Sequence, residues 1–226
     1  MKRRLFTFSL CINVLFVAFI IAYFVHRQQF QQSVQKESYS VHSGWDTVRN
    51  GVYDLYPVTA HDIVFVGTSL TALFPLNELF HSIPIKNRGV EGNTVKNINY
   101  RIDAILQAHP KKLFIEGGVN DILMGIPADT TLHYYQNILS CCQRTSPQTI
   151  IYVQSLLPFF NAKASLNPSV QFLNKRVRSL CAKYRVHYID LYSGFIFPGI
   201  YSVDGIHVNA SGYRVWVERI KNEVSD

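Results

Sequence analysis

The stretch VFVGTSLTALF, residues 64–74, places one glycine and two hydroxyl residues between two apolar runs. The first run is short, β-branched and aromatic, which is typical of a buried strand, and the second run favours a helix. Thr68 or Ser69 could therefore simply cap that helix, because Ser and Thr are preferred at this position. Alternatively, Ser69 could be a nucleophile at the carboxyl end of a strand. The rest of the chain bears on this choice.

Strand and helix patterns alternate from this stretch to the end of the chain. Short apolar runs predict strands over residues 62–67, 83–89, 112–118, 149–156 and 186–191. Apolar residues at helical spacing, with proline and cap signals, predict helices over residues 70–82, 94–110, 129–144, 167–184 and 209–224. Strands separated by helices predict a three-layer α/β/α sandwich around a five-stranded parallel sheet, in the flavodoxin-like order 2-1-3-4-5.

The predicted order of strands also predicts where a site lies. In open parallel sheets, sites form outside the carboxyl ends of the strands, at the crevice where the strand order reverses. Here that crevice lies between the first and third strands. Ser69 follows the first strand, Gly92 the second and Asn120 the third, whereas Asp204 and His207 lie in a loop after the fifth. We therefore expect these residues to converge at one edge of the sheet.

These residue types are those that a serine nucleophile requires. Ser69 supplies a hydroxyl, His207 can accept its proton, and Asp204 can accept the other imidazole N–H and fix the tautomer. The backbone N–H groups of Ser69 and Gly92 and the side-chain amide of Asn120 are candidate donors to an oxyanion. The sequence thus predicts a Ser-His-Asp triad with an oxyanion hole.

Each assignment has a plainer alternative. Gly89 ends the same strand that leads to Gly92 and could serve in its place. Asp204 could only form a turn with the glycine that follows it, and Asn120 could be a turn residue beside Asp121. His207 could be a surface histidine before a helix.

Four blocks of the chain resemble the GDSL or SGNH hydrolases, in the order of that family: VFVGTSLT, NRGVEGNT, GGVND and VDGIH. The resemblance runs from about residue 60 to the carboxyl terminus. It implies that Ser69 is the nucleophile, that Asp204 and His207 complete the triad, and that Gly92 and Asn120 complete the oxyanion hole. It also implies acyl ester or thioester substrates (lipids, acetylated sugars or small esters) and no cofactor or metal.

Position 68 departs from the family pattern. The family usually has Asp between the glycine and the serine, where this chain has Thr68. Because that Asp is not part of the triad, we expect altered hydrogen bonding in the loop rather than loss of the reaction, and threonine can still bond neighbouring backbone. Two rival functions remain open: acyl transfer to a glycan hydroxyl, and a non-catalytic glycan-binding module that keeps the fold.

The first 27 residues predict a membrane anchor. Residues 5–25 carry no charge and would span about 30 Å as a helix, the thickness of the bilayer core. We expect an uncleaved signal anchor over residues 1–27, in preference to a cleaved signal peptide. Lys2, Arg3 and Arg4 would hold the amino end in the cytoplasm and place the rest outside. A polar stalk over residues 28–58 would then lead to a catalytic domain over residues 59–226.

Charge and cysteine usage exclude other classes. The formal charge of +7 is concentrated in the anchor, and no basic block or basic–aromatic stripe indicates nucleic acid as a partner. Cys141, Cys142 and Cys181 have no Cys-x-x-Cys or Cys/His spacing of a zinc site, and we interpret them mainly as small buried residues. Pairing of Cys141 or Cys142 with Cys181 remains open.

The tract SLLPFFNAKASLNPS, residues 155–169, follows the fourth predicted strand and is rich in Phe and Leu. It could form the wall of an acyl pocket or a mobile flap. Equally, it could be an ordinary loop packed on the core. The sequence favours neither interpretation.

Overall fold

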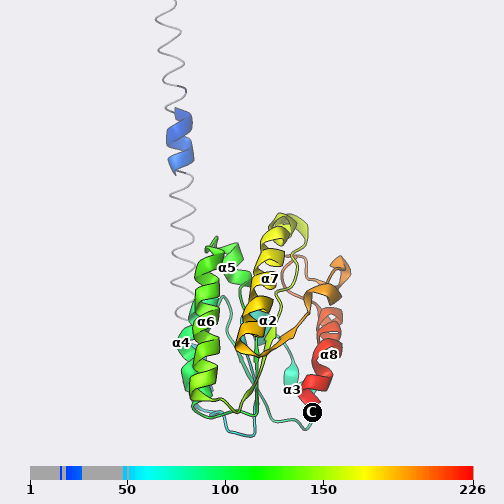
Figure 1. Cartoon of the computed structure of the whole chain (residues 1–226). Helices are drawn as coiled ribbons and strands as arrows, with labels where there is room; N and C mark the ends of the chain where they lie inside the picture. The colour runs from blue at the N-terminus through cyan, green and yellow to red at the C-terminus, as the bar shows by residue number, and fades with distance from the viewer. Residues whose placement is uncertain (1–15, 17–18, 27–47, 50, 226) are drawn as a thin grey trace, which may run out of the picture. The chain divides into compact units, whose positions relative to one another are not determined.

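The computed structural model describes residue 16 and residues 19–26, 48–49 and 51–225. Its centre is a five-stranded sheet in which every neighbouring pair of strands is parallel (Figure 1). The strands are β1 (Ile63–Gly67), β2 (Ile85–Gly89), β3 (Lys112–Ile115), β4 (Ile150–Gln154) and β5 (His187–Ile189). Their order, β2-β1-β3-β4-β5, confirms the sequence prediction.

Helices cover both faces of the sheet. They are α2 (Ser69–Ala72), α3 (Leu76–Leu79), α4 (Val95–Leu106), α5 (Val119–Leu123), α6 (Ala128–Thr145), α7 (Asn167–Tyr184) and α8 (Ala210–Ser225). The chain crosses the sheet in one direction from β1 to β2, and in the other direction from β2 through β3 and β4 to β5. Because such connections are right-handed, the helices of the two groups lie on opposite faces of the sheet. Accordingly α4, α6 and α7 lie side by side as one layer, and α8 packs beside α2 on the other face.

Aromatic side chains fill the core on the face of α2 and α8. Phe65, Phe114 and Tyr152 stand in register on the three central strands and stack with ring centroids 4.4 and 4.6 Å apart. Trp216 of α8 is fully buried, and its indole N–H donates to the Gln154 side chain at 2.7 Å. This packing fixes α8, and with it the loop that precedes it, against the sheet.

Several predicted elements were wrong in extent, and two of these differences lie near the site. The single helix expected over residues 70–82 is split into α2 and α3, because Pro75 stands between them, lacks an N–H and disfavours helix in the residue before it. The third strand ends at Ile115 rather than at residue 118. Gly118 instead has a φ of 106° and precedes α5, a five-residue helix that was not predicted.

Most of the predicted anchor, residues 1–27, and of the predicted stalk, residues 28–58, lies outside the described residues. Within the part of the chain that the structure describes, no helix has the length and apolar character needed to cross a membrane. Residues 48–49 and 51–54 are helical and touch the rest of their compact unit. Arg49 pairs with Glu91 at 2.5 Å, and the Tyr53 hydroxyl donates to the Gly89 carbonyl at 2.5 Å.

The cysteines behave as small core residues. Cys141, Cys142 and Cys181 are buried free thiols, so no disulfide joins them in this structure. Burial raises the pKa of Cys142 and of Cys181 to about 12, which keeps both thiols protonated and unreactive at neutral pH.

Candidate functional site

The turn that carries Ser69 is built by Gly67 and Thr68. A Cβ atom at Gly67 would lie 2.1 Å from the Thr71 hydroxyl oxygen, so only glycine lets α2 approach the end of β1 this closely. Thr68 is the N-cap of α2, and its hydroxyl accepts the N–H of Leu70 at 3.3 Å. Ser69 is the first helical residue. Capping therefore falls to Thr68, which leaves the Ser69 side chain available for another contact.

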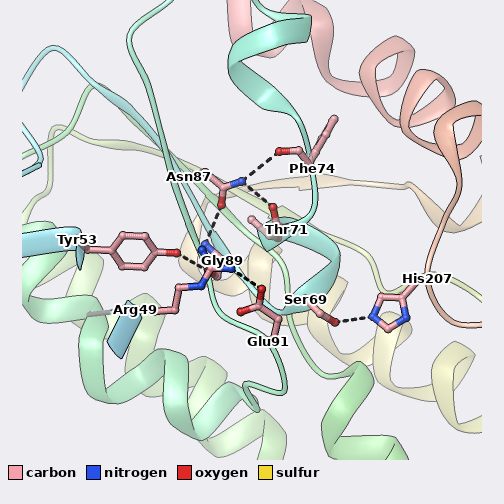
Figure 2. Close-up of polar contacts among 9 residues, drawn as sticks. All are labelled: Arg49, Tyr53, Ser69, Thr71, Phe74, Asn87, Gly89, Glu91 and His207. Carbon is pink, nitrogen blue, oxygen red and sulfur yellow. Dashed lines mark hydrogen bonds and ion pairs between the residues drawn. The ribbon is translucent and has the colours of Figure 1, made fainter. Parts of the chain in front are cut away.

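The Ser69 side chain meets His207 (Figure 2). Its Oγ lies 2.9 Å from His207 Nε2, although the two residues are 138 positions apart. On the other side of the ring, His207 Nδ1 lies 2.6 Å from Asp204 Oδ2. The structure thus brings the three predicted residues into one line of hydrogen bonds.

The loop before α8 holds Asp204 and His207 in this arrangement. Asp204 Oδ1 accepts the backbone N–H groups of Ile206 and His207, at 2.9 and 3.0 Å. Gly205, between Asp204 and Ile206, has a φ of 68°, which suits glycine. Burial acts to raise the pKa of Asp204, but the hydrogen bonds from His207 and from Ile206 outweigh it and hold that pKa below its ordinary value. Asp204 is therefore ionised at neutral pH.

Gly92 lies in the loop after β2, and Asn120 lies in the short helix α5 that follows β3. The Asn120 side-chain amide donates to the carbonyl of Asn93 at 2.9 Å, which leaves its second N–H to serve another acceptor. Gly92 has a φ of 73° in the turn between β2 and α4. The alternative, Gly89, is paired within β2, and its N–H already donates to the Asn87 side chain at 2.9 Å. This geometry favours Gly92.

The Arg101 side chain ties these loops to the Ser69 turn, and sequence reasoning missed it. From α4 its guanidinium donates to the carbonyl of Gly67 at 3.0 Å, to that of Arg88 at 2.7 Å and to the side chain of Asn93 at 3.1 Å. One planar fork thus links the ends of β1 and β2 with the loop that contains Gly92. Its position on a predicted amphipathic helix gave no signal of this role.

Asp121 anchors the segment that carries Asn120. It is 1 % exposed and accepts the backbone N–H of Val95 and the hydroxyl of Thr131, each at 3.0 Å. Burial raises the pKa of Asp121, although these hydrogen bonds oppose the shift. Asn120 is therefore a residue of a short helix held between α4 and α6, and not merely part of a turn.

A second buried carboxylate, missed in the sequence, lies beside the Ser69 turn. Glu116 follows β3 and is 2 % exposed. It accepts hydrogen bonds from the Thr68 N–H and from the hydroxyls of Thr68 and Thr71. The one signal available was an acidic residue directly after the apolar run of residues 113–115 in a predicted buried strand, since buried charges are rare unless they are well bonded.

The tract of residues 155–169 is divided between the core and the site. Leu156, Leu157 and Phe159 are buried, so the first half is a loop packed on the core. Phe160 then contacts the loop of the predicted triad, because its N–H donates to the Gly205 carbonyl at 2.9 Å.

Among the described residues no group of three or more His, Cys, Asp or Glu side chains is arranged to hold a metal ion.

Comparisons with known proteins identify the family and the fold of the chain. The model of the GDSL-like lipase/acylhydrolase family matches residues 70–215. Among solved structures, a protein of Streptococcus pneumonia, provisionally described as a platelet activating factor, is 24 % identical with a TM-score of 0.74, covering 85 % of this chain and 97 % of its own. No curated protein sequence matches the chain.

Two further solved structures are named as esterase or lipase. A GDSL-like lipase of Bacteroides thetaiotaomicron is 20 % identical with a TM-score of 0.63, covering 74 % of this chain and 88 % of its own. Axe2, an acetylxylan esterase of Geobacillus stearothermophilus, is 16 % identical with a TM-score of 0.59, covering 74 % and 95 %. At these identities the likeness shows a shared fold.

Proposed function

The chain belongs to the GDSL-like lipase/acylhydrolase family and is a carboxylic ester hydrolase, and we propose that it works through Ser69, His207 and Asp204. The observation that carries the proposal is the 2.9 Å contact between Ser69 Oγ and His207 Nε2, continued by the 2.6 Å contact to Asp204. A hydroxyl, an imidazole and an ionised carboxylate in this order form an activated nucleophile.

The acylation step follows from this line of groups. Ser69 Oγ attacks the ester carbonyl carbon while His207 Nε2 accepts the hydroxyl proton. Asp204 keeps the proton of the ring on Nδ1 and stabilises the imidazolium that forms. His207 then returns its proton to the leaving alkoxide as the ester C–O bond breaks, which leaves an acyl group on Ser69.

Three donors would stabilise the oxyanion of the tetrahedral intermediate. Ser69 is the first residue of α2, so no helix carbonyl accepts its N–H. The Gly92 N–H and the remaining N–H of the Asn120 amide complete the set. Preformed donors of this kind are each worth about 10²–10³ in rate. Water activated by His207 then hydrolyses the acyl-enzyme.

For the substrate we propose a small or carbohydrate O-acyl ester, or a lysolipid. The side chains of His207 and Asp204 are 32 % and 41 % exposed, so the reacting groups are open to an ester carried on a bulky molecule. The likeness to an acetylxylan esterase supports the carbohydrate ester.

We also propose that residues 1–27 anchor the chain in a membrane, with the catalytic domain on the outer side. Reporter fusions at the carboxyl terminus, active only outside or only inside the cell, test that orientation.

The direct test is hydrolysis of p-nitrophenyl acetate by the purified full-length chain. Ser69→Ala should lower kcat by at least about 10³-fold with an unchanged melting temperature, because the nucleophile is lost without disturbing the fold. Equal rates in the two proteins would contradict the proposal. Product analysis with an added glycan acceptor distinguishes water from a sugar hydroxyl as the acyl acceptor.

A further inference from the structure

The Glu116 carboxyl group lies beside the Ser69 turn and is 2 % exposed, and the reaction proposed above does not use it. Its backbone N–H donates to the carbonyl of Val66 at 2.9 Å, which extends the pairing of β1 and β3 by one residue. Its side chain therefore emerges from the sheet directly beside the turn after β1. Within the described part of the chain no lysine, arginine or histidine forms an ion pair with it.

Burial raises the pKa of Glu116, and hydrogen bonds from Thr68 and Thr71 oppose that rise. Glu116 Oε2 accepts the Thr68 N–H at 2.9 Å, the Thr68 hydroxyl at 2.9 Å and the Thr71 hydroxyl at 3.0 Å. A Cβ on Gly67 would lie 2.6 Å from the same oxygen, so the backbone is packed directly against it. These donors come from Thr68, immediately before Ser69, and from Thr71, two residues after it, so the carboxylate binds the turn on both sides of the nucleophile.

The identity of residue 68 follows from this contact. A hydroxyl can donate one hydrogen bond while accepting another, and Thr68 does both: it donates to Glu116 and accepts the Leu70 N–H. An ionised aspartate at position 68 could accept the Leu70 N–H but could not donate to Glu116. It would also place another carboxylate in a buried space where burial already raises the pKa of Glu116. The threonine that departs from the family pattern thus matches the glutamate on the next strand.

We propose that Glu116 is a positioning residue, which acts through Thr68 to set Ser69 Oγ against His207 Nε2. The proposal rests on the proposed function of Ser69. Glu116 forms no hydrogen bond with Ser69 or His207 among the described contacts, so its influence is through the backbone of the turn. A small displacement of a nucleophile costs much more rate than stability, because reacting atoms must be held within tenths of an ångström.

The chain offers a matched control at the other end of β1. Asp62 is 4 % exposed and accepts the N–H and the hydroxyl of Thr59, at 2.7 and 3.0 Å. The two carboxylates therefore bind a threonine in the same way, one at the amino edge of the sheet and one at the carboxyl edge. A loss of stability that comes only from breaking a buried contact between a carboxylate and a threonine should therefore appear in variants of Glu116 and of Asp62 alike.

The experiment compares Glu116→Gln, Thr68→Val and Thr68→Ser with Asp62→Asn in the full-length chain, measuring kcat, KM and melting temperature with p-nitrophenyl acetate. Glu116→Gln and Thr68→Val should each lower kcat by about 10- to 100-fold with KM within about threefold. The double variant should lose less kcat than the product of the two single losses, since both substitutions weaken the contact between Thr68 and Glu116. Thr68→Ser, which keeps the hydroxyl, should recover most of the rate. Asp62→Asn should lower the melting temperature and leave kcat unchanged.

The proposal is overturned if Glu116→Gln and Thr68→Val retain kcat. It is also overturned if Asp62→Asn loses as much kcat for the same fall in melting temperature, or if Thr68→Ser is as defective as Thr68→Val. Were Glu116→Gln to fail to fold, the pair Thr68→Val and Thr68→Ser decides alone. Retention of activity by Ser69→Ala would instead refute the proposed function, which separates the two failures.

Discussion

Two loops meet at the candidate site, and they are held in different ways. The Ser69 turn is fixed from within the sheet by Glu116, whose side chain is almost fully buried. The loop of residues 89–93, which carries Gly92, is fixed partly from outside. Its Glu91 pairs with Arg49 through side chains that are 34 % and 37 % exposed, and Tyr53 donates to the Gly89 carbonyl (Figure 2).

This difference predicts how each loop responds to change. Removing one partner of a buried charged hydrogen bond leaves the other partner unsatisfied, which is costly, whereas an exposed ion pair is worth roughly 0–1 kcal/mol. We therefore expect the Ser69 turn to be rigid and the glycine loop to be adjustable. Arg49 and Tyr53 precede the predicted catalytic domain, residues 59–226, so we expect the position of the glycine loop to depend on contacts from the predicted stalk, residues 28–58.

The largest effect should come from substituting the proposed triad of Ser69, His207 and Asp204. His207→Ala should lower kcat by at least about 10³-fold, and the double variant Ser69→Ala with His207→Ala should lose no more than either single variant, because the groups act as a unit. Steady-state kinetics with p-nitrophenyl acetate measure this. Multiplied losses in the double variant would show that the two residues act independently.

A smaller effect should follow when the link between the two loops is broken. Arg101→Lys keeps the charge but loses the planar fork that reaches Gly67, Arg88 and Asn93. We expect kcat to fall about tenfold and the free energy of unfolding to fall by about 1–3 kcal/mol. Kinetics and chemical denaturation measure the two changes. Arg176→Lys, at an exposed pair with Asp129, is the control and should change neither.

The partly exposed ion pair between Arg49 and Glu91 of the glycine loop should matter less. Arg49→Ala should lower kcat/KM by less than about threefold, and Glu91→Gln should do the same, because solvent screens this pair. The difference from the unsubstituted protein should vanish in about 1 M salt, where the Debye length is about 3 Å. A tenfold loss that persists in salt would contradict the contrast between the two loops.

The smallest effect concerns stability against pH. The pKa of Asp204 lies below its ordinary value in the folded chain, so its ionised form stabilises the fold at pH values above the unfolded pKa of 3.8. Asp204→Asn should therefore melt slightly below the unsubstituted protein at pH 7. The gap should close as the pH falls through the folded pKa, below 3.8. Thermal melts from pH 7 to about pH 2.5 test this, and a gap that widens in acid would refute it.

Much of the fold could be predicted because its signals are local. Short β-branched runs marked the five strands, and helical spacing marked α7, which spans residues 167–184 as expected. The failures also have local causes. Pro75 ended a helix whose apolar pattern continued, and α5 is too short to show a helical period.

The candidate site was predictable where its residues stand out by type and spacing. Ser69, His207 and Asp204 stood out by type and spacing, and the structure brings them together. Glu116 and Arg101 support the site through contacts with backbone groups from other elements. Such contacts depend on which strands are neighbours, and no short sequence pattern records them.

The most direct test of the central claim is to locate the nucleophile chemically. The full-length chain is treated with a fluorophosphonate, digested, and the modified peptide identified by mass spectrometry. The account predicts one adduct per chain, on Ser69, formed slowly or not at all in His207→Ala. An adduct on another residue, or equal labelling of Ser69→Ala, would contradict it.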